Sequence, residues 1–235
     1  MKILVINPNT TESMTEHLRR TLTPLKGPDT ELVVRNPEHG PVSIESAYDE
    51  AMAIPPTLEL VRQAEKEGFA AVVLACFSDP GLEAARELVS IPVVGIEEAT
   101  LHVAAMLGFK FSIMTSRRER VPSKVEHVAR RGLESKLASV RPLDMSVLEM
   151  DAEPERTKKR ILEVAGAAVR EDGAEVIILG CAGLAGYAED IERELGVIVL
   201  DPSPIAFKMA ELLAGLGLKH SKRGLYACPP PKLIR

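Results

Sequence analysis

The sequence predicts an α/β protein with two pseudo-symmetric domains, each a mainly parallel sheet with helices on both faces, and a site in the cleft between them. First, residues 68–99 and 173–204 resemble each other at an offset of 105 residues, which places Cys76 on Cys181. Second, both copies contain a largely apolar run, at 70–75 and 175–179, typical of a strand buried on both faces of a parallel sheet. Third, strand-like and helix-like stretches alternate along the chain, as in parallel α/β folds.

The first half is predicted to open with a strand that ends at a turn, followed by a helix from about residue 13. Ser13 and Glu16 have the spacing of a capping box at the start of that helix. Pro55 and Pro56 are expected to begin a later helix, because proline is tolerated in a first helical turn. The predicted elements are strands at 2–7, 31–35, 70–75 and 92–95, helices from 13, at 55–67 and at 80–89, and a loop rich in proline and glycine at 36–43.

The second half is predicted to repeat this order, with residues 110–115 resembling the first strand of the chain. Its predicted elements are helices at 97–107, around 125–128, at 153–171 and at 205–216, and strands at 110–115, near 140 and in the second repeat copy. We expect the last helix to cross back onto the first half. The predicted domains are therefore 1–97 with 205–235, and 98–204.

Composition and charge narrow the classes of partner. A net charge of -5, without a basic cluster, argues against nucleic acid or an anionic membrane surface. The start of the chain reads as a strand rather than a signal peptide, and no apolar run is long enough to cross a bilayer. Three cysteines in 235 residues do not form a disulfide framework. These features predict a cytoplasmic protein with free thiols and a small-molecule ligand.

The chemistry is expected at the carboxyl ends of the strands, where ligands bind in open parallel sheets. Cys76 and Cys181 stand at two equivalent strand ends, each at a turn whose backbone N–H groups are expected to lower the thiol pKa. Two thiols that face a planar carbon can remove a proton from one side and return one to the other. The backbone N–H groups after the cysteines are expected to hold the enolate oxygen meanwhile; they belong to Phe77, Ser78, Ala182 and Gly183.

Each candidate also has an ordinary structural explanation. A buried cysteine often serves only as a small apolar core residue, although the matched repeat makes this weaker for Cys76 and Cys181. Cys228, in a proline-rich tail without a repeat partner, receives no role. Asp79 either contacts substrate or caps the helix that Pro80 begins.

The remaining strand ends carry polar residues with two possible roles each. Asn7 and Asn9 either bind substrate or close the turn after the first strand. Thr115 and Ser116 either offer hydroxyls to a ligand or cap the next helix. None of the five histidines has a metal-ligand spacing with a cysteine, so no metal is expected. A glycine-rich phosphate fingerprint is missing after the first strand, so no nucleotide cofactor is expected either.

Motifs along nearly the whole chain resemble those of the aspartate/glutamate racemase superfamily, and within it the hydantoin and allantoin racemases. They are Ile6-Asn7-Pro8-Asn9-Thr10 with Met14-Thr15, Gly40-Pro41-Val42-Ser43-Ile44-Glu45 with Tyr48-Asp49-Glu50-Ala51, Ala75-Cys76-Phe77-Ser78-Asp79-Pro80-Gly81-Leu82, Pro92-Val93-Val94-Gly95-Ile96-Glu97, Phe111-Ser112 with Thr115, and Gly180-Cys181-Ala182-Gly183. The chain departs from the usual hydantoin racemase pattern at Ser78 and Leu184.

The resemblance implies a cofactor-independent isomerase, usually a homo-oligomer, that uses Cys76 and Cys181 as its two acid/base residues. The substrate-binding residues that we predict are Asn9, Ser43, Ile44, Phe77, Ser78, Asp79, Thr115, Ser116, Ala182 and Gly183. Amino-acid racemases of this fold place groups for a carboxylate and an ammonium beside their cysteines. Here Asp79 is the only charged neighbour along the chain, which favours a neutral ring.

The predicted function is therefore racemisation of a 5-substituted hydantoin or of allantoin. One alternative is an amino-acid racemase of the aspartate/glutamate type. A second is an enzyme like arylmalonate decarboxylase or maleate isomerase, which depends chiefly on one cysteine. A third, from another class, is a small-molecule sensor without turnover, for which one cysteine of the pair would be replaced by an inert residue.

Overall fold

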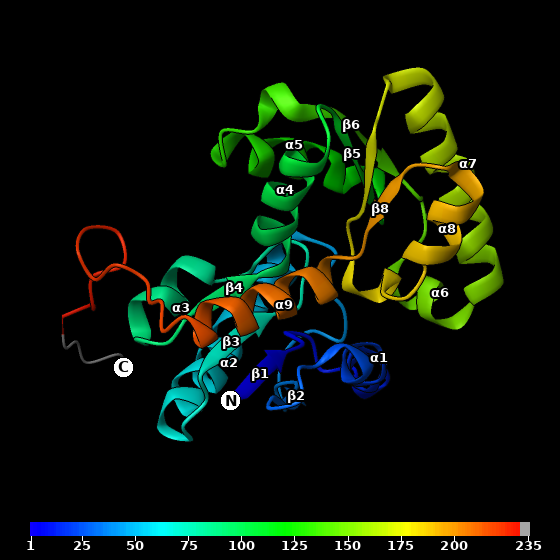
Figure 1. Cartoon of the computed structure of the whole chain (residues 1–235). Helices are drawn as coiled ribbons and strands as arrows, with labels where there is room; N and C mark the ends of the chain where they lie inside the picture. Colours follow the sequence, from blue (N-terminus) through cyan, green and yellow to red (C-terminus); the bar gives the residue numbers. More distant parts are fainter. Residues whose placement is uncertain (231–235) are drawn as a thin grey trace.

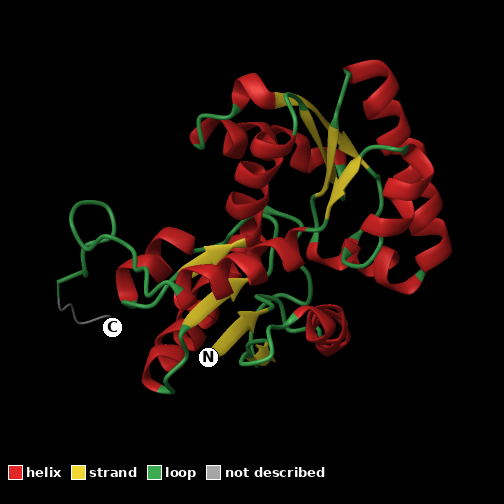
Figure 2. Ribbon diagram, viewed as in Figure 1, coloured by secondary structure: helices red, strands yellow, loops and turns green. Residues whose placement is uncertain are grey.

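The computed structural model describes residues 1–230, and within them the strands form two four-stranded parallel sheets. The strand orders are β2-β1-β3-β4 and β6-β5-β7-β8, so the second sheet repeats the topology of the first. Figure 1 shows the two sheets in separate halves of the molecule, and Figure 2 shows helices around each of them. The predicted fold class is confirmed.

The first sheet pairs β1 with β2 and β3, and β3 with β4. Its strands are β1 (Lys2–Ile6), β2 (Glu31–Arg35), β3 (Ala71–Leu74) and β4 (Val93–Gly95). The connecting helices are α1 (Glu12–Leu22), η1 (Thr23–Leu25), α2 (Ala47–Lys66), α3 (Leu82–Leu88) and α4 (Ile96–Leu107). The side chains of β3 are fully buried, as the apolar run predicted for a strand covered on both faces.

The second sheet pairs β5 with β6 and β7, and β7 with β8. Its strands are β5 (Phe111–Thr115), β6 (Leu137–Pro142), β7 (Val176–Leu179) and β8 (Ile198–Leu200). The helices of this part are η2 (Arg118–Arg120), α5 (Val121–Arg130), η3 (Glu134–Lys136), α6 (Val147–Ala152), α7 (Pro154–Asp172), η4 (Ala182–Leu184) and α8 (Ala188–Leu195). The offset of 105 residues seen between Cys76 and Cys181 also relates β3 to β7 and β4 to β8 at both ends.

The last helix, α9 (Pro202–Gly215), leaves the second sheet and packs on α4, β3 and β4. Figure 1 shows it lying along the first half, beside β3 and β4. This packing supports the assignment of the chain's end to the first domain, and we retain the boundaries at 97 and 204 as a proposal. The part of that domain beyond residue 230 lies outside the described residues.

One predicted helix start and one predicted helix cap are wrong. Helix α2 begins eight residues before Pro55, because Ser46 and Asp49 form a capping box in which each side chain accepts a backbone N–H of the other. Both prolines lie inside the helix. The carbonyl groups that lose a partner there belong to Ala51 and Met52, which are exposed, so water can satisfy them.

Helix α1 begins at Glu12, which confirms the predicted start at about residue 13, but the predicted capping box is not formed. The Ser13 hydroxyl instead donates to Asp151 of α6, 3.1 Å away, and Glu16 forms an ion pair with Arg19. Ser13 therefore links α1 of the first half to α6 of the second half rather than capping its own helix.

Across residues 1–230, no helix combines the length and the apolar character that a membrane crossing requires.

Candidate active site

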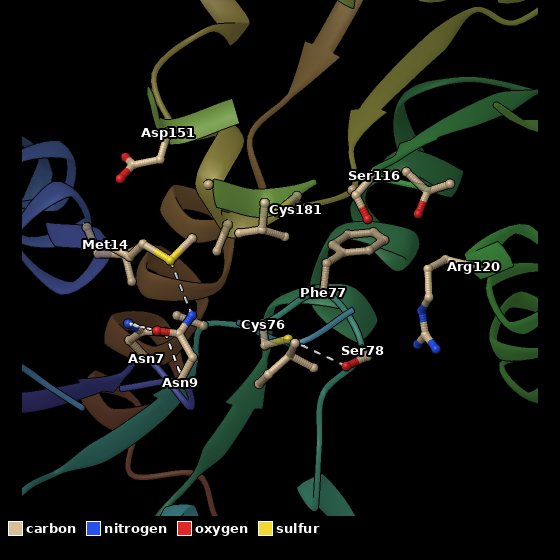
Figure 3. Close-up of a pocket in the computed structure, with 18 of the residues that line it drawn as sticks. Asn7, Asn9, Met14, Cys76, Phe77, Ser78, Ser116, Arg120, Asp151 and Cys181 are labelled. Atoms are coloured by element: carbon tan, nitrogen blue, oxygen red, sulfur yellow. Dashed lines mark hydrogen bonds between the residues drawn. The ribbon is translucent and has the colours of Figure 1, made fainter. Parts of the chain in front are cut away.

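The carboxyl ends of the central strands of both sheets meet at one cavity. Ile6 of β1 pairs with Leu74 of β3, and Met114 of β5 pairs with Leu179 of β7, so each parallel pair ends at the same edge. Cys76 and Cys181 each follow the last residue of their strand by two positions, which brings both to this edge. Figure 3 shows the two cysteines on opposite walls of the cavity.

Eight of the ten predicted substrate-binding residues line this cavity together with Cys76 and Cys181. They are Asn9, Ile44, Phe77, Ser78, Thr115, Ser116, Ala182 and Gly183. Ser43 does not line it: its hydroxyl donates to Glu45 Oε1, 3.1 Å away, while the next residue, Ile44, reaches the cavity. Substrate contact by these eight residues stays a prediction.

Asp79 lies outside the cavity, and its prediction as a substrate contact is not supported by its position. Its carboxylate accepts the backbone N–H groups of Glu97 and Glu98, at 2.9 and 2.8 Å, in the first turn of α4. Asp79 is thus a cap, but of α4 rather than of the helix that follows it. Gly95 leaves it room, because a Cβ at that position would collide with the Asp79 carboxyl group. Burial, reinforced by the charge of Glu97, raises the pKa of Asp79 to about 7.

The two asparagines after β1 close their turn and also face the cavity. Asn7 Nδ2 donates to Asn9 Oδ1 and to Thr15 Oγ1, at 2.9 and 3.0 Å, and Asn9 Oδ1 accepts the backbone N–H of Thr11. Asn9 therefore closes the turn after β1, and its place in the cavity is compatible with substrate binding as well. The carboxamide Nδ2 of Asn9 lies 3.3 Å from the sulfur of Met14. Because this sulfur is a weak acceptor, the N–H groups of Asn9 Nδ2 remain available to a stronger acceptor in the cavity.

Thr115 and Ser116 line the opposite wall and are buried. Their backbone carbonyls accept the N–H groups of Leu143 and Met145, at 2.7 and 3.1 Å. The next helical turn, η2, begins after Arg117 without a side-chain cap. The capping alternative is therefore wrong, and both residues line the cavity.

Both thiols are poor acids in this environment. Burial raises the pKa of Cys76 to about 12, although Ser78, whose hydroxyl lies 3.5 Å from the sulfur, and the charge of Lys124 oppose the change. Burial raises the pKa of Cys181 to about 11, against the N–H groups of Gly183 and Leu184 and the charge of Lys124. The expected lowering of both pKa values is wrong, because loss of hydration outweighs the nearby N–H groups.

This environment predicts the reactivity of the thiols toward iodoacetamide, which reacts with the thiolate. We expect alkylation of Cys76 and Cys181 to keep rising beyond about pH 9, since burial raises the pKa of both thiols well above the usual range, to about 12 and about 11. Peptide mass spectrometry resolves the two sites, with the exposed Cys228 as a reference in the same chain. A plateau below about pH 9 for either of the two half-buried thiols would contradict this environment.

Charged side chains that no sequence motif revealed also line the cavity, so the expected neutral wall is wrong. They are Glu50, Arg120, Lys124 and Asp151, and the imidazole of His17 lies beside them. They come from α1, α2, η2, α5 and α6, and no local motif marks a helical residue as facing a distant cleft. Arg120 forms an ion pair with Glu50, and Lys124 forms one with Glu97. Most of this charge is therefore already paired inside the protein.

Metal binding finds no support in residues 1–230, where no group of three or more His, Cys, Asp and Glu side chains is close enough to hold an ion. The Cys, His, Asp and Glu side chains of the cavity itself are two thiols on opposite walls and three side chains with other partners. Glu50 is engaged with Arg120, Asp151 with Ser13, and His17 with the Ala185 carbonyl.

Comparison with known proteins agrees with this architecture. The chain is 42% identical over 233 residues to a hydantoin racemase of Pseudomonas sp. strain NS671, covering 99% of this chain and 93% of that protein. It is 41% identical over 229 residues to a hydantoin racemase of Rhizobium meliloti, covering 97% and 95% of the two chains. The structure of the allantoin racemase from Klebsiella pneumoniae superposes with a TM-score of 0.96 at 38% identity, covering 100% of this chain and 96% of that one.

The model of the Asp/Glu/hydantoin racemase family matches residues 3–210, which span both sheets and both cysteines. The predicted resemblance is confirmed, and so is the prediction of an isomerase of the racemase class. The chain belongs to the Asp/Glu/hydantoin racemase family.

Proposed function

We propose that this protein racemises 5-substituted hydantoins or allantoin with Cys76 and Cys181 as its two acid/base residues and without a cofactor. The observation that carries the proposal is the position of the thiols at equivalent strand ends, on opposite walls of one cavity. The names of the similar proteins, hydantoin racemase and allantoin racemase, support the choice of substrate class.

The proposed reaction moves one proton off the ring carbon and one proton onto it. The thiolate of one cysteine removes the C5 proton, and the bonding electron pair moves into the adjacent carbonyl to give an enolate. The thiol of the other cysteine then donates its proton to the opposite face of C5, and the electron pair returns. The enzyme is left with the thiol and thiolate exchanged, so the same site serves the reverse direction.

The raised thiol pKa values suit this chemistry. A carbon acid is a weak acid, and a thiolate of high pKa is a stronger base toward it than one of ordinary pKa. The opposing effect is that few molecules carry a thiolate near neutral pH. Because one proton is shared by two interacting thiols, the active monoanion belongs to the pair rather than to one cysteine.

The paired charges of the cavity favour a neutral substrate over an amino-acid zwitterion. Glu50 and Arg120 neutralise each other on one side, and Lys124 is held by Glu97. A ring of amide and urea groups needs hydrogen bonds, which the hydroxyls of Ser78, Thr115 and Ser116 can supply. The proposal also includes a cytoplasmic location, which the composition suggests, and a homo-oligomer, which the family resemblance suggests.

The proposal is tested by following one pure enantiomer of 5-benzylhydantoin, and separately of allantoin, by polarimetry and chiral chromatography. We expect the rotation to decay to zero at constant total concentration, because both enantiomers share one enolate. Aspartate and a disubstituted malonate serve as comparison substrates. Loss of rotation from aspartate alone would show that the substrate is an amino acid and not a hydantoin or allantoin. Release of carbon dioxide from the malonate alone would show that the enzyme is a decarboxylase and not a racemase.

A further inference from the structure

A buried ammonium group adjoins the cavity. Lys124, on α5, has a side chain that is 4% exposed, and it lines the cavity together with Cys76 and Cys181. Its Nζ donates to the backbone carbonyl of Phe77, the residue after Cys76, and to Glu97 Oε1 at 2.9 Å. The ammonium is therefore attached directly to the turn that carries the first thiol.

The partner of this ammonium is itself held in place. The Glu97 carboxylate, 1% exposed, has His127 Nδ1 2.7 Å from its second oxygen. Burial raises the pKa of Glu97, but Lys124 and His127 outweigh this, so the pKa lies below its ordinary value. Lys124 and His127 are one helical turn apart on α5, and both contact Glu97 of α4. The position of the ammonium is therefore fixed by the packing of α5 on α4.

Stability alone gives little reason for such a pair. Two buried charges lose their hydration, and an apolar pair of similar volume often serves the fold as well or better. A buried cation beside a cavity with two thiols suggests instead a role in the charge balance of the reaction.

The charged side chains around the two thiols differ in their effect on the thiol pKa values. Glu50, on α2, raises the pKa of Cys76, and Glu45, before that helix, raises the pKa of Cys181. These two carboxylates form ion pairs with Arg120 and Arg117 respectively. Asp151 and His17 line the α6 and α1 side of the cavity, where they bond to Ser13 and to the Ala185 carbonyl. Lys124 acts on both thiols and lowers the pKa of each.

We infer that Lys124 is a positioning residue that holds the Cys76 turn and balances the single negative charge that the two thiols and the substrate share, with Glu97 and His127 keeping the ammonium in place. This inference rests on the proposed function. The charge resides first on one thiolate, then on the enolate, and then on the other thiolate. A fixed cation beside all three stabilises each of them, so its main effect is to enlarge the monoanionic fraction at a given pH.

The test uses variants in which the buried pair is altered together. Lys124→Met alone would leave Glu97 without its cation, so the main variant is Lys124→Met with Glu97→Gln, which keeps both shapes and a hydrogen-bonding partner for His127. Lys124→Arg is the conservative variant. Lys158→Met is the matched control, because Lys158 pairs with Asp190, 2.7 Å away on the outer helices α7 and α8.

Two readouts are measured across pH: iodoacetamide alkylation at Cys76 and Cys181, resolved by mass spectrometry, and kcat/KM for 5-benzylhydantoin. In the double variant we expect alkylation of both thiols at about pH 9 to fall about tenfold, the factor for one pKa unit. The pH profile of kcat/KM is expected to move to higher pH by the same amount, with KM little changed. Lys124→Arg keeps the positive charge beside the thiols and is expected to stay within about threefold of wild type. Lys158→Met is expected to match wild type.

The same alkylation rates and an unmoved pH profile in the double variant would overturn the inference, even if activity fell at every pH, since a purely structural role predicts that pattern. The alkylation readout needs no turnover. Slower alkylation in a protein that racemises none of the substrates would support the role of Lys124 in thiol ionisation and sink the proposed function separately.

Discussion

Replacing either Cys76 or Cys181 by alanine is expected to lower kcat/KM for racemisation by about 10²- to 10⁴-fold, the usual contribution of a general acid or base. The physical reason is that each direction needs both thiols, one as base and one as acid. Loss of either blocks both directions, although at different steps. The measurement is the initial rate from each pure enantiomer, compared with Cys228→Ala, whose thiol lies exposed in the tail and outside the cavity.

The two variants should also differ from each other in a way that a damaged fold would not produce. Each is expected to retain slow exchange of the C5 proton with solvent for the enantiomer whose base remains, without inversion, because an enolate that no second thiol traps gives the first thiol time to exchange its proton. Near wild-type racemisation by either variant, with intact far-UV circular dichroism, would show that one cysteine suffices and would remove the two-thiol mechanism.

Removing Glu97 is expected to destabilise the protein far more than removing a carboxylate from a surface ion pair. Glu97→Ala leaves the Lys124 ammonium, 4% exposed, without its carboxylate. An uncompensated buried charge typically destabilises a protein by about 3–5 kcal/mol. Urea unfolding measured by circular dichroism checks this value.

The matched control for Glu97 is Glu163→Ala, since Glu163 pairs with Arg160 at 3.0 Å but has a side chain that is 67% exposed. A surface pair contributes about 0–1 kcal/mol, so this variant should unfold close to wild type. Equal losses for the two variants would mean that Lys124 finds another partner or water once Glu97 is gone, and would weaken the description of the pair as buried.

Much of the fold follows from patterns that are local in sequence. The offset of 105 residues between Cys76 and Cys181 also relates β3 to β7 and β4 to β8, because both copies encode the same strand, helix and strand. Parallel strands end at one edge, so residues just after β1, β3, β5 and β7 are expected to meet, and eight predicted residues do line the cavity.

The features that sequence patterns do not reveal depend on contacts between distant segments. The residues next to Lys124 in the sequence do not mark it as facing a cleft. Asp79 caps α4, a helix that begins 17 residues further along the chain, at Ile96. The predicted start of α2 is wrong because two prolines look like a stronger signal than the capping box that opens at Ser46. The predicted thiol pKa values are wrong in direction, since burial depth is a property of the whole fold.

The most direct test of the two-thiol proposal is the position of deuterium early in the reaction, in deuterated buffer with one pure enantiomer of 5-benzylhydantoin. A thiol equilibrated with solvent delivers deuterium to the product, while the first thiol holds the proton it removed. We therefore expect deuterium at C5 of the newly formed enantiomer and protium in the remaining substrate, after correction for exchange without enzyme. Deuterium appearing equally in the recovered substrate from the first turnovers would indicate a single solvent-exchanging base and contradict the assignment of separate roles to Cys76 and Cys181.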